Sequence, residues 1–293
     1  MAFSAILVYL LGVSFIYASR YPYYNTESRP SKYSPRWMKD LDNNTVLSRL
    51  SIPGTHQTLS FYGGDAVQCQ SWSLLDQYKA GIRFVDIRCI LYQNRLYIYH
   101  DTIYQRTDLE TTLRETQRFL QDNPTETILM RIRNEDPFRP TNSTETFTQV
   151  FRKTLGLFPA SLVWRRYYMP ELRRLRGKIV LLREFPSSSM LGIFYHGLKI
   201  KDDWYVASLF SSRISAKWEG VKAHLEKARH DPSSSTYLSY TSGNGFWAYP
   251  YSVAFRVNYL CLGYLKQFSK GRLGIIAMDF PGEQLIENVL NKN

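Results

Sequence analysis

The chain of 293 residues has little cysteine, and no spacing of a metal-binding motif links the cysteines that it has. The three thiols, Cys69, Cys89 and Cys261, allow at most one internal disulfide and leave one thiol over. A network of disulfides therefore does not hold this chain together. We predict no bound metal ion and no cofactor.

Internal repeats and polar low-complexity tracts are also absent, which excludes a solenoid and extended disorder. The composition, 44% hydrophobic and 15% aromatic, is that of a globular protein. A chain of this length forms one large or two small domains, and barrels often reach it as a single unit.

Only one apolar run is long, at residues 4–18, and it has the length of a signal-peptide core rather than of a membrane span. We predict a secretory signal over 1–19, with a signal anchor as the alternative. A loosely ordered arm rich in Tyr, Pro and Ser follows over 20–39, and one domain over 40–293. Sequons at Asn43 and Asn142 agree with a secreted, extracellular protein.

Acidic residues are fewer than basic ones, 25 against 37, and the net charge is +12. A basic chain favours anionic partners such as lipid head groups, phosphodiesters or nucleic acid. The charge narrows the class of partner but does not identify it.

Short apolar runs recur along the chain, with room for helices between them. Eight of them have the near-continuous apolar character of strands buried on both faces. They lie at 46–52, 82–91, 96–100, 127–132, 178–185, 204–209, 236–240 and 273–280. Helical patterns occupy 108–121 and 214–229. This alternation predicts an α/β barrel of parallel strands, whose C-terminal strand ends carry the chemistry.

Polar side chains collect where these runs finish. The set comprises His56, Asp86, Arg88, His100, Arg133, Glu135 and Asp279. Each has an ordinary structural explanation taken alone, such as a hydrogen-bonded histidine, a salt bridge within a strand or a helix cap. Together they are suited to cleaving a phosphodiester by internal attack. One imidazole takes a proton from the attacking hydroxyl, the other gives one to the leaving oxygen, and a guanidinium stabilises the added charge.

Several segments resemble the X domain of the bacterial-type, metal-independent phosphatidylinositol-specific phospholipases C. They are SIPGTHQT, QYKAGIRFVDIR, LYIYHD, RFLQDNPTETILMRIRNE and GIIAMDF, and the match runs in order from about residue 40 to the end. The resemblance implies a single distorted (β/α)8 TIM-type barrel. It also implies cleavage of phosphatidylinositol, or of its glycosylated anchors, to diacylglycerol and inositol 1,2-cyclic phosphate.

The resemblance also implies roles for individual residues. His56 resembles the general base, His100 the general acid and Arg88 the phosphate-stabilising cation, while Asp279 orients the base and Asp86 steers the arginine. Candidate substrate-binding residues are Arg133, Glu135, Arg183, Asp202 and Trp204. Calcium-using relatives carry a carboxylate where this chain has Arg88, whose positive charge would repel a divalent cation, so no calcium is expected.

Two positions depart from the family pattern. Gln57 stands where the family usually has Asp; a glutamine can keep an orienting hydrogen bond but cannot stabilise an imidazolium. We therefore expect His100 to be a less readily protonated acid and the activity to be reduced. Glu184 stands where the family has an inositol-binding arginine, so Arg183 beside it would have to substitute.

A surface that meets the membrane is expected around residues 240–251, YTSGNGFWAYPY, where aromatic side chains follow a glycine-rich tip. The candidates are Trp72, Phe246, Trp247, Tyr249 and Tyr251. The alternative is an ordinary aromatic core loop.

Two other functions remain open beside a phosphatidylinositol phospholipase C acting at a membrane. The barrel could bind lipid or glycan without turnover, because Gln57 and Glu184 depart from the pattern. A basic ribonuclease ranks last, because no base-stacking platform is evident at the proposed mouth. We expect a monomer with no nucleic-acid partner.

Overall fold

Eight parallel strands frame the part of the chain that this computed structural model describes, residues 20–135, 141–187 and 191–293. In chain order they are β3 (Ser51–Thr55), β4 (Phe84–Tyr92), β7 (Thr127–Asn134), β9 (Lys178–Glu184), β10 (Ile193–Phe194), β11 (Lys199–Lys201), β12 (Tyr237–Tyr240) and β13 (Gly274–Met278). The last strand, β13, pairs in parallel with the first, β3. Within the described residues, β10 and β11 do not pair with each other. The predicted α/β barrel is confirmed, with an opening in the ring between these two strands.

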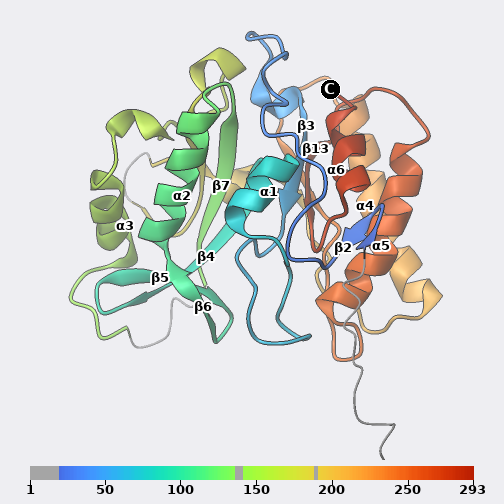
Figure 1. Ribbon diagram of the computed structural model, residues 1–293, viewed down its shortest axis with the longest axis horizontal. Helices are drawn as coiled ribbons and strands as arrows, with labels where there is room; N and C mark the ends of the chain where they lie inside the picture. Colours follow the sequence, from blue (N-terminus) through green and yellow to red (C-terminus); the bar gives the residue numbers. More distant parts are fainter. Residues whose placement is uncertain (1–19, 136–140, 188–190) are drawn as a thin grey trace, which may run out of the picture.

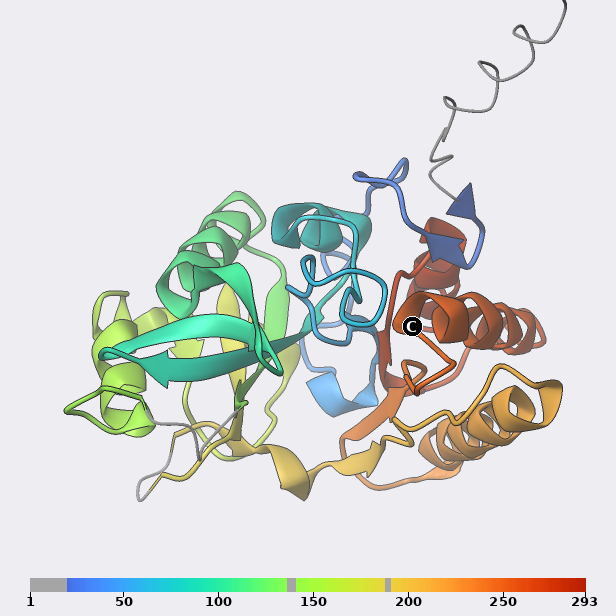
Figure 2. The ribbon, with the colours of Figure 1, turned by 90° about the horizontal axis from the view of Figure 1, so that it is seen from below.

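The helices lie outside the strands (Figures 1 and 2). They are α1 (Leu74–Ala80), α2 (Leu109–Asp122), α3 (Phe147–Gly156), α4 (Ser211–His230), α5 (Pro250–Leu265) and α6 (Glu283–Leu290). Short 3-10 turns are η1 (Leu47–Arg49), η2 (Ala160–Leu162), η3 (Leu172–Arg174) and η4 (Tyr195–Gly197). The remaining strands are β1 (Arg20–Tyr21), β2 (Tyr24–Asn25), β5 (Arg95–His100), β6 (Ile103–Asp108) and β8 (Val163–Trp164). In Figure 1, α2 and α3 lie at the left and α4, α5 and α6 at the right.

Some expected elements differ from the observed ones. The run at 96–100 is a strand, but β5 pairs antiparallel with β4 and β6 in a hairpin and does not belong to the ring. The run at 204–209 forms no strand, and its place in the ring is taken by β11, just before it. These residues form a loop instead, and the aromatic side chains of Trp204 and Tyr205 are both 61% exposed on it.

Successive side chains along each strand point alternately into the ring and out toward the helices, which gives two apolar layers. On β9, Val180 and Leu182 point into the ring, where they join Phe84 and Leu238 in one cluster. The neighbouring Ile179 and Leu181 belong to a second cluster, which the helices cover. Strands buried on both faces require apolar residues at nearly every position, which is the pattern that the sequence has.

Gly54 lets the first two strands of the ring approach closely. It pairs with Phe84 of β4, and a Cβ at residue 54 would lie 2.7 Å from the Phe84 Cβ. Any larger residue would push β3 away from β4 and move the residues that follow Thr55. Gly54 therefore sets the spacing between β3 and β4, and the strand continues beyond it to Thr55.

Residues 20–39, which we expected to be a loosely ordered arm, pack against the barrel. Asn25 and Ser31 donate hydrogen bonds to the Glu283 carboxylate at the start of α6, and Tyr24 and Met38 are buried. The predicted signal at 1–19 lies outside the described residues. No helix in the described ranges is long and apolar enough to cross a membrane. Both sequon asparagines, Asn43 and Asn142, are exposed.

A fully buried ion pair lies at the N-terminal end of the barrel strands, just before β4 begins. The Arg83 guanidinium donates to Glu126 Oε2 through Nη2 at 2.8 Å and Nε at 3.0 Å, and both side chains have no exposed surface. Arg83 also donates to the carbonyl oxygens of Tyr78 and Ile82. Removing one charge leaves the other buried and uncompensated, which costs much more than the intact pair contributes.

The substitution Glu126→Gln is expected to lower the free energy of unfolding by about 3–5 kcal/mol, because it leaves Arg83 without its counterion. Urea unfolding followed by circular dichroism measures the change. The control is Glu110→Gln, which breaks the exposed pair of Glu110 with Arg114 and is expected to cost less than about 0.5 kcal/mol. Equal midpoints for the two variants would contradict the role of the buried pair.

Candidate active site

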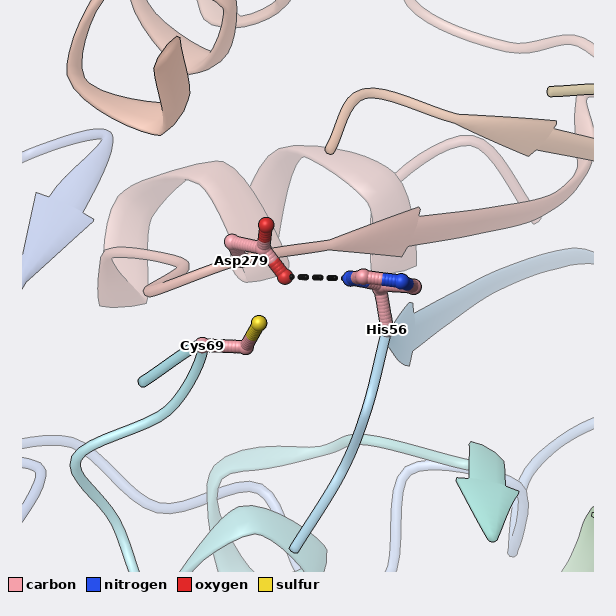
Figure 3. Close-up of side chains that lie close together, drawn as sticks. All are labelled: His56, Cys69 and Asp279. Carbon is pink, nitrogen blue, oxygen red and sulfur yellow. Dashed lines mark hydrogen bonds and ion pairs between the residues drawn. The ribbon is translucent and has the colours of Figure 1, made fainter. Parts of the chain in front are cut away.

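The pairing of the first strand with the last brings His56 to Asp279. Thr55 of β3 lies beside Met278 of β13, so the next residue of each strand meets the other at the rim. His56 Nδ1 and Asp279 Oδ1 are 2.9 Å apart (Figure 3). A carboxylate on Nδ1 holds the proton there and leaves Nε2 as the basic nitrogen.

The β5–β6 hairpin brings the second histidine to the same rim. β5 pairs with the far half of β4 on the edge that β3 vacates, and it runs back toward the end of β3. His100 ends that strand, and its Nδ1 lies 2.8 Å from Ser60 Oγ. Since Ser60 Oγ donates to the Val67 carbonyl oxygen at 2.8 Å, the serine accepts the Nδ1 proton. Nε2 of His100 is then the nitrogen available for proton exchange.

Arg88 is held between carboxylates on neighbouring strands. Its Nη2 donates to Asp86 Oδ2 at 3.0 Å, and its Nη1 lies 3.5 Å from Glu135 Oε1. Asp86 is buried and also accepts from Arg131 Nη1 at 3.1 Å. Burial opposes its charge, but Arg131 and Arg88 hold the pKa of the Asp86 carboxyl well below its usual value. The guanidinium of Arg88 is thus fixed in one orientation.

These side chains line a cavity of about 350 Å³ at the C-terminal ends of the strands. Its lining residues are His56, Cys69, Arg88, His100, Arg133, Asp202, Trp204, Ser242, Gly243, Asn244, Pro250 and Asp279. Seven of the ten residues predicted to be catalytic or substrate-binding lie in this lining, namely His56, Arg88, His100, Arg133, Asp202, Trp204 and Asp279. Asp86 and Glu135 lie behind it as partners of Arg88.

Burial shifts the pKa of several groups in this cavity. Burial, together with the neighbouring His56 and the positive charge of Arg88, lowers the pKa of His100 to about 3. We expected a less readily protonated acid, and the direction agrees. Burial raises the pKa of Asp279, and the proximity of His56 opposes that shift. Burial and the Asp279 charge raise the pKa of the Cys69 thiol.

Gln57 does not orient His100, although a glutamine can keep such a bond in principle and we expected one here. Its backbone has a φ of +42°, and its side-chain Nε2 lies 3.4 Å from Glu135 Oε1. Ser60 makes the orienting bond instead, four residues after His56 in the chain. A hydroxyl carries no charge, so it fixes the tautomer of His100 without stabilising its imidazolium.

Arg183 does not reach the cavity, contrary to prediction. Adjacent residues on a strand point to opposite faces, and on β9 it is Glu184 that points inward, accepting from Arg131 Nε at 2.7 Å. Arg183 instead donates to the Phe185 carbonyl oxygen and lies over the Phe194 ring. Arg131, which the sequence reasoning missed, occupies the inward side.

A pairing of charged residues on two strands could have identified Arg131. Asp86 pairs with Arg131, and Arg88 pairs with Arg133, so a D-x-R sequence on β4 lies beside an R-x-R sequence on β7. Residues two apart share one face of a strand. The same alternation that favoured Arg133 therefore also indicated Arg131. Nothing in the local sequence signalled Ser60 or Cys69, which lie on a loop.

The aromatic candidates for the membrane surface divide into two groups. Phe246 and Trp247 are 77% and 72% exposed, and Tyr249 is 38% exposed. Their loop pairs with the loop of Trp204 and Tyr205 through a bridge between Tyr205 and Asn244. These exposed rings therefore stand at the mouth of the cavity.

Two of the predicted membrane residues are placed otherwise. Trp72 is only 2% exposed and belongs to the main core cluster, so its prediction as a membrane residue is wrong. It precedes Ser73, the N-cap of α1, and this short helix turns the ring inward. Tyr251 is half-buried in the first turn of α5 and packs against Tyr24 and Phe280.

The arrangement combines two proton-exchanging nitrogens and one fixed cation around a single cavity. His56 is poised as a base by Asp279, Nε2 of His100 is free, and Arg88 cannot swing away from its carboxylates. A substrate that needs a proton removed at one oxygen, a proton delivered to another and negative charge stabilised between them fits this set.

Comparison with known proteins agrees with this chemistry. The family described as "Phosphatidylinositol-specific phospholipase C, X domain" matches residues 44–185. The chain is similar to a 1-phosphatidylinositol phosphodiesterase of Listeria monocytogenes, with 31% identity covering 92% of this chain and 89% of that one. It is also similar to a 1-phosphatidylinositol phosphodiesterase of Staphylococcus aureus, with 26% identity covering 90% and 95%.

Solved structures show the same fold. The phosphatidylinositol-specific phospholipase C of Listeria monocytogenes matches with a TM-score of 0.78 and 28% identity over 89% of this chain and 99% of that one. A Staphylococcus aureus phosphatidylinositol-specific phospholipase C, from work on its membrane binding, matches with a TM-score of 0.77 and 25% identity over 90% and 98%.

The bond to Ser60 predicts one tautomer for His100. The ring is expected to stay neutral and protonated at Nδ1 between about pH 5 and pH 8, because a lowered pKa keeps the imidazole uncharged down to acid pH. Nitrogen-15 NMR of the histidine side chains measures both properties. Ser60→Ala should give a mixture of tautomers, whereas Ser71→Ala, whose hydroxyl donates to the Asn25 carbonyl, should not. A charged His100 at neutral pH would contradict the assignment.

Proposed function

The chain belongs to the phosphatidylinositol-specific phospholipase C family, and from this membership we propose that it cleaves phosphatidylinositol at a membrane surface. The products are diacylglycerol and inositol 1,2-cyclic phosphate. The observation that carries the proposal is the convergence of His56, His100 and Arg88 on one cavity. Glycosylated phosphatidylinositol anchors contain the same phosphodiester and are the second substrate class.

His56 starts the reaction as the general base. Its Nε2 takes the proton from the inositol 2-hydroxyl while that oxygen attacks phosphorus, and the imidazolium that forms donates through Nδ1 to Asp279. Asp279 is buried and carries its charge 2.9 Å from the ring, which offsets the cost of the positive imidazolium. The base is therefore strengthened at the moment of attack.

His100 completes the reaction as the general acid. Its Nε2 protonates the glycerol oxygen as the bond from phosphorus to that oxygen breaks, which releases diacylglycerol. The low pKa of His100 means that the ring is largely unprotonated in the free protein at neutral pH. The anionic phosphodiester beside the ring favours its protonated form, so substrate binding itself helps to load the acid.

Arg88 stabilises the charge that builds up on the nonbridging oxygens. Its guanidinium is fixed by Asp86 and Glu135, so no reorientation is required during the reaction. The Arg88 guanidinium in this position stabilises the same negative charge that calcium stabilises in other branches of the family. We therefore propose turnover without calcium.

Arg133, Asp202 and Trp204 form the wall that meets the inositol ring. Arg133 is 37% exposed in its side chain and lies 3.5 Å from Glu135, so its guanidinium is available to ring hydroxyls. Asp202 offers a hydroxyl acceptor, and Trp204 offers a flat apolar face. Charge, hydrogen bonding and stacking together suit a polyol that carries a phosphate.

We also propose that the protein is secreted and meets the membrane with the side that carries Phe246 and Trp247. The apolar run at 4–18 and the exposed sequons support export, and Phe246 and Trp247 support contact with the lipid interface. We propose that the protein acts as a monomer, without nucleic acid, on the outer side of a membrane.

The proposed function is tested with purified protein, phosphatidylinositol vesicles and a chelator. Phosphorus NMR should detect inositol 1,2-cyclic phosphate. His56→Ala and His100→Ala should each lower the rate by at least about 100-fold, because each removes a proton-transfer step. His230→Ala is the matched control, since His230 is exposed and pairs with Glu226 on α4.

Three results would count against the proposal. Vesicle binding without any cyclic phosphate would favour the lipid-binding barrel. Unchanged rates in both active-site variants would exclude acid-base catalysis by these rings. Cleavage of a ribodinucleotide in place of the lipid would favour the ribonuclease.

The exposed rings at the mouth should anchor the protein to lipid. The double substitution of Phe246 and Trp247 by alanine is expected to weaken vesicle binding at least about tenfold, because two large apolar side chains leave the interface. Vesicle sedimentation measures the change. Tyr33→Ala is the control, since Tyr33 is 52% exposed and its neighbour Ser34 binds the Lys79 carbonyl at the opposite end of the barrel. Equal losses in both variants would contradict a local anchor.

A further inference from the structure

Cys69 has no part in the proposed reaction. Cys69 lies in the cavity lining with no exposed surface, on the loop between β3 and α1. Its sulfur lies 3.4 Å from the Val67 carbonyl oxygen and 4.0 Å from His100 Nδ1. The cavity therefore contains a thiol directly beside its two imidazoles.

This thiol completes a set of metal-binding atoms. One ligand atom from each of His56, Cys69 and Asp279 lies within 4.8 Å of the others, and the three side chains point toward one another (Figure 3). Imidazole nitrogen, thiolate sulfur and carboxylate oxygen are the donors that zinc takes in proteins. A tetrahedral zinc ion separates such donors by roughly 3.3–3.6 Å, so small side-chain rotations suffice.

An unpartnered atom also points to a ligand here. Oδ2 of Asp279 is buried and has no hydrogen-bond partner among the described residues, although Oδ1 binds His56. Buried carboxylate oxygens are normally paired, because an unpaired one keeps its desolvation cost. Figure 3 shows this oxygen on the side of the carboxylate away from Cys69. A rotation of the carboxylate would bring this oxygen to a cation held by the three side chains and supply the missing partner.

We propose that His56, Cys69 and Asp279 form an inhibitory zinc site. The ion binds the three side chains and keeps one open position toward the cavity, and the Cys69 thiol proton passes to solvent as the sulfur–zinc bond forms. The inhibition, though not the binding, rests on the proposed function. Zinc on His56 Nδ1 displaces the proton that this nitrogen shares with Asp279. The proton moves to Nε2 through solvent, and a protonated Nε2 cannot act as a base.

The positive charge of Arg88 does not exclude this ion. The thiolate and the carboxylate together cancel the two charges of zinc, and Arg88 is already paired with Asp86 and Glu135. Calcium prefers six to eight oxygen ligands and gains little from sulfur. The site therefore discriminates between the two metals through Cys69.

Metal binding is measured first, without any substrate. Cobalt in place of zinc should give a thiolate-to-cobalt charge-transfer band in the near ultraviolet, and equilibrium dialysis should find one zinc per chain. Cys69→Ala should lose the band and bind zinc at least about tenfold more weakly. Cys261→Ala is the matched control, because Cys261 is equally buried but lies in α5 outside the cavity. A wild-type protein without the band, or a Cys69→Ala variant that keeps it, would overturn the site.

Inhibition is measured next, on phosphatidylinositol vesicles at buffered free zinc. Each variant is compared with its own rate without zinc. Wild type and Cys261→Ala should lose most of their turnover at zinc concentrations that leave Cys69→Ala active. Equal inhibition of all three would overturn the inhibitory role. If the wild type never hydrolyses the lipid, the proposed function fails, while the cobalt band still decides whether the metal site exists.

Discussion

The parallel pairing of β3 with β13 is the constraint on which the rest of the site depends. Five residues of each strand are in register, from Ser51 beside Gly274 to Thr55 beside Met278. The first and last parts of the chain are joined there, and the next residue on each side, His56 and Asp279, forms the 2.9 Å bond at the rim. Gly54 permits the close approach of β4 to β3, so that β4 lies beside the β3–β13 pair. The same strand pairing that joins β3 to β13 therefore also places His56 against Asp279.

Ion pairs behind the cavity lining hold its arginine side chains in place. Asp86 stands between Arg88 and Arg131, and Glu184 holds the far side of Arg131. Buried ions of one sign would be costly, but here each guanidinium has a carboxylate on the neighbouring strand. The alternation binds three strands of the ring together through their inward side chains. Arg133 also lines the cavity, and its side chain is more exposed than those of Arg88 and Arg131.

The sequence predicts the barrel well because strands buried on both faces leave a continuous apolar pattern, and the chemistry well because polar residues interrupt that pattern at strand ends. His56, Arg88, His100 and Asp279 were all located in this way. Residues on loops were not. Ser60 and Cys69 reach the cavity through the path of the loop before α1, which no periodicity describes. Trp72 was misplaced because an aromatic ring beside a short helix suits a lipid surface and a core equally well, and only packing decides.

The unpaired stretch between β10 and β11 makes the barrel a split ring. Every other neighbouring pair in the described sheet is joined by backbone hydrogen bonds, so the wall can widen at this seam without breaking any of them. The loop that carries Asp202 and Trp204 follows β11 directly. Substituents on the sugar that project toward this side face the gap in the sheet, whereas His56 and Asp279 follow strands that are paired on both sides.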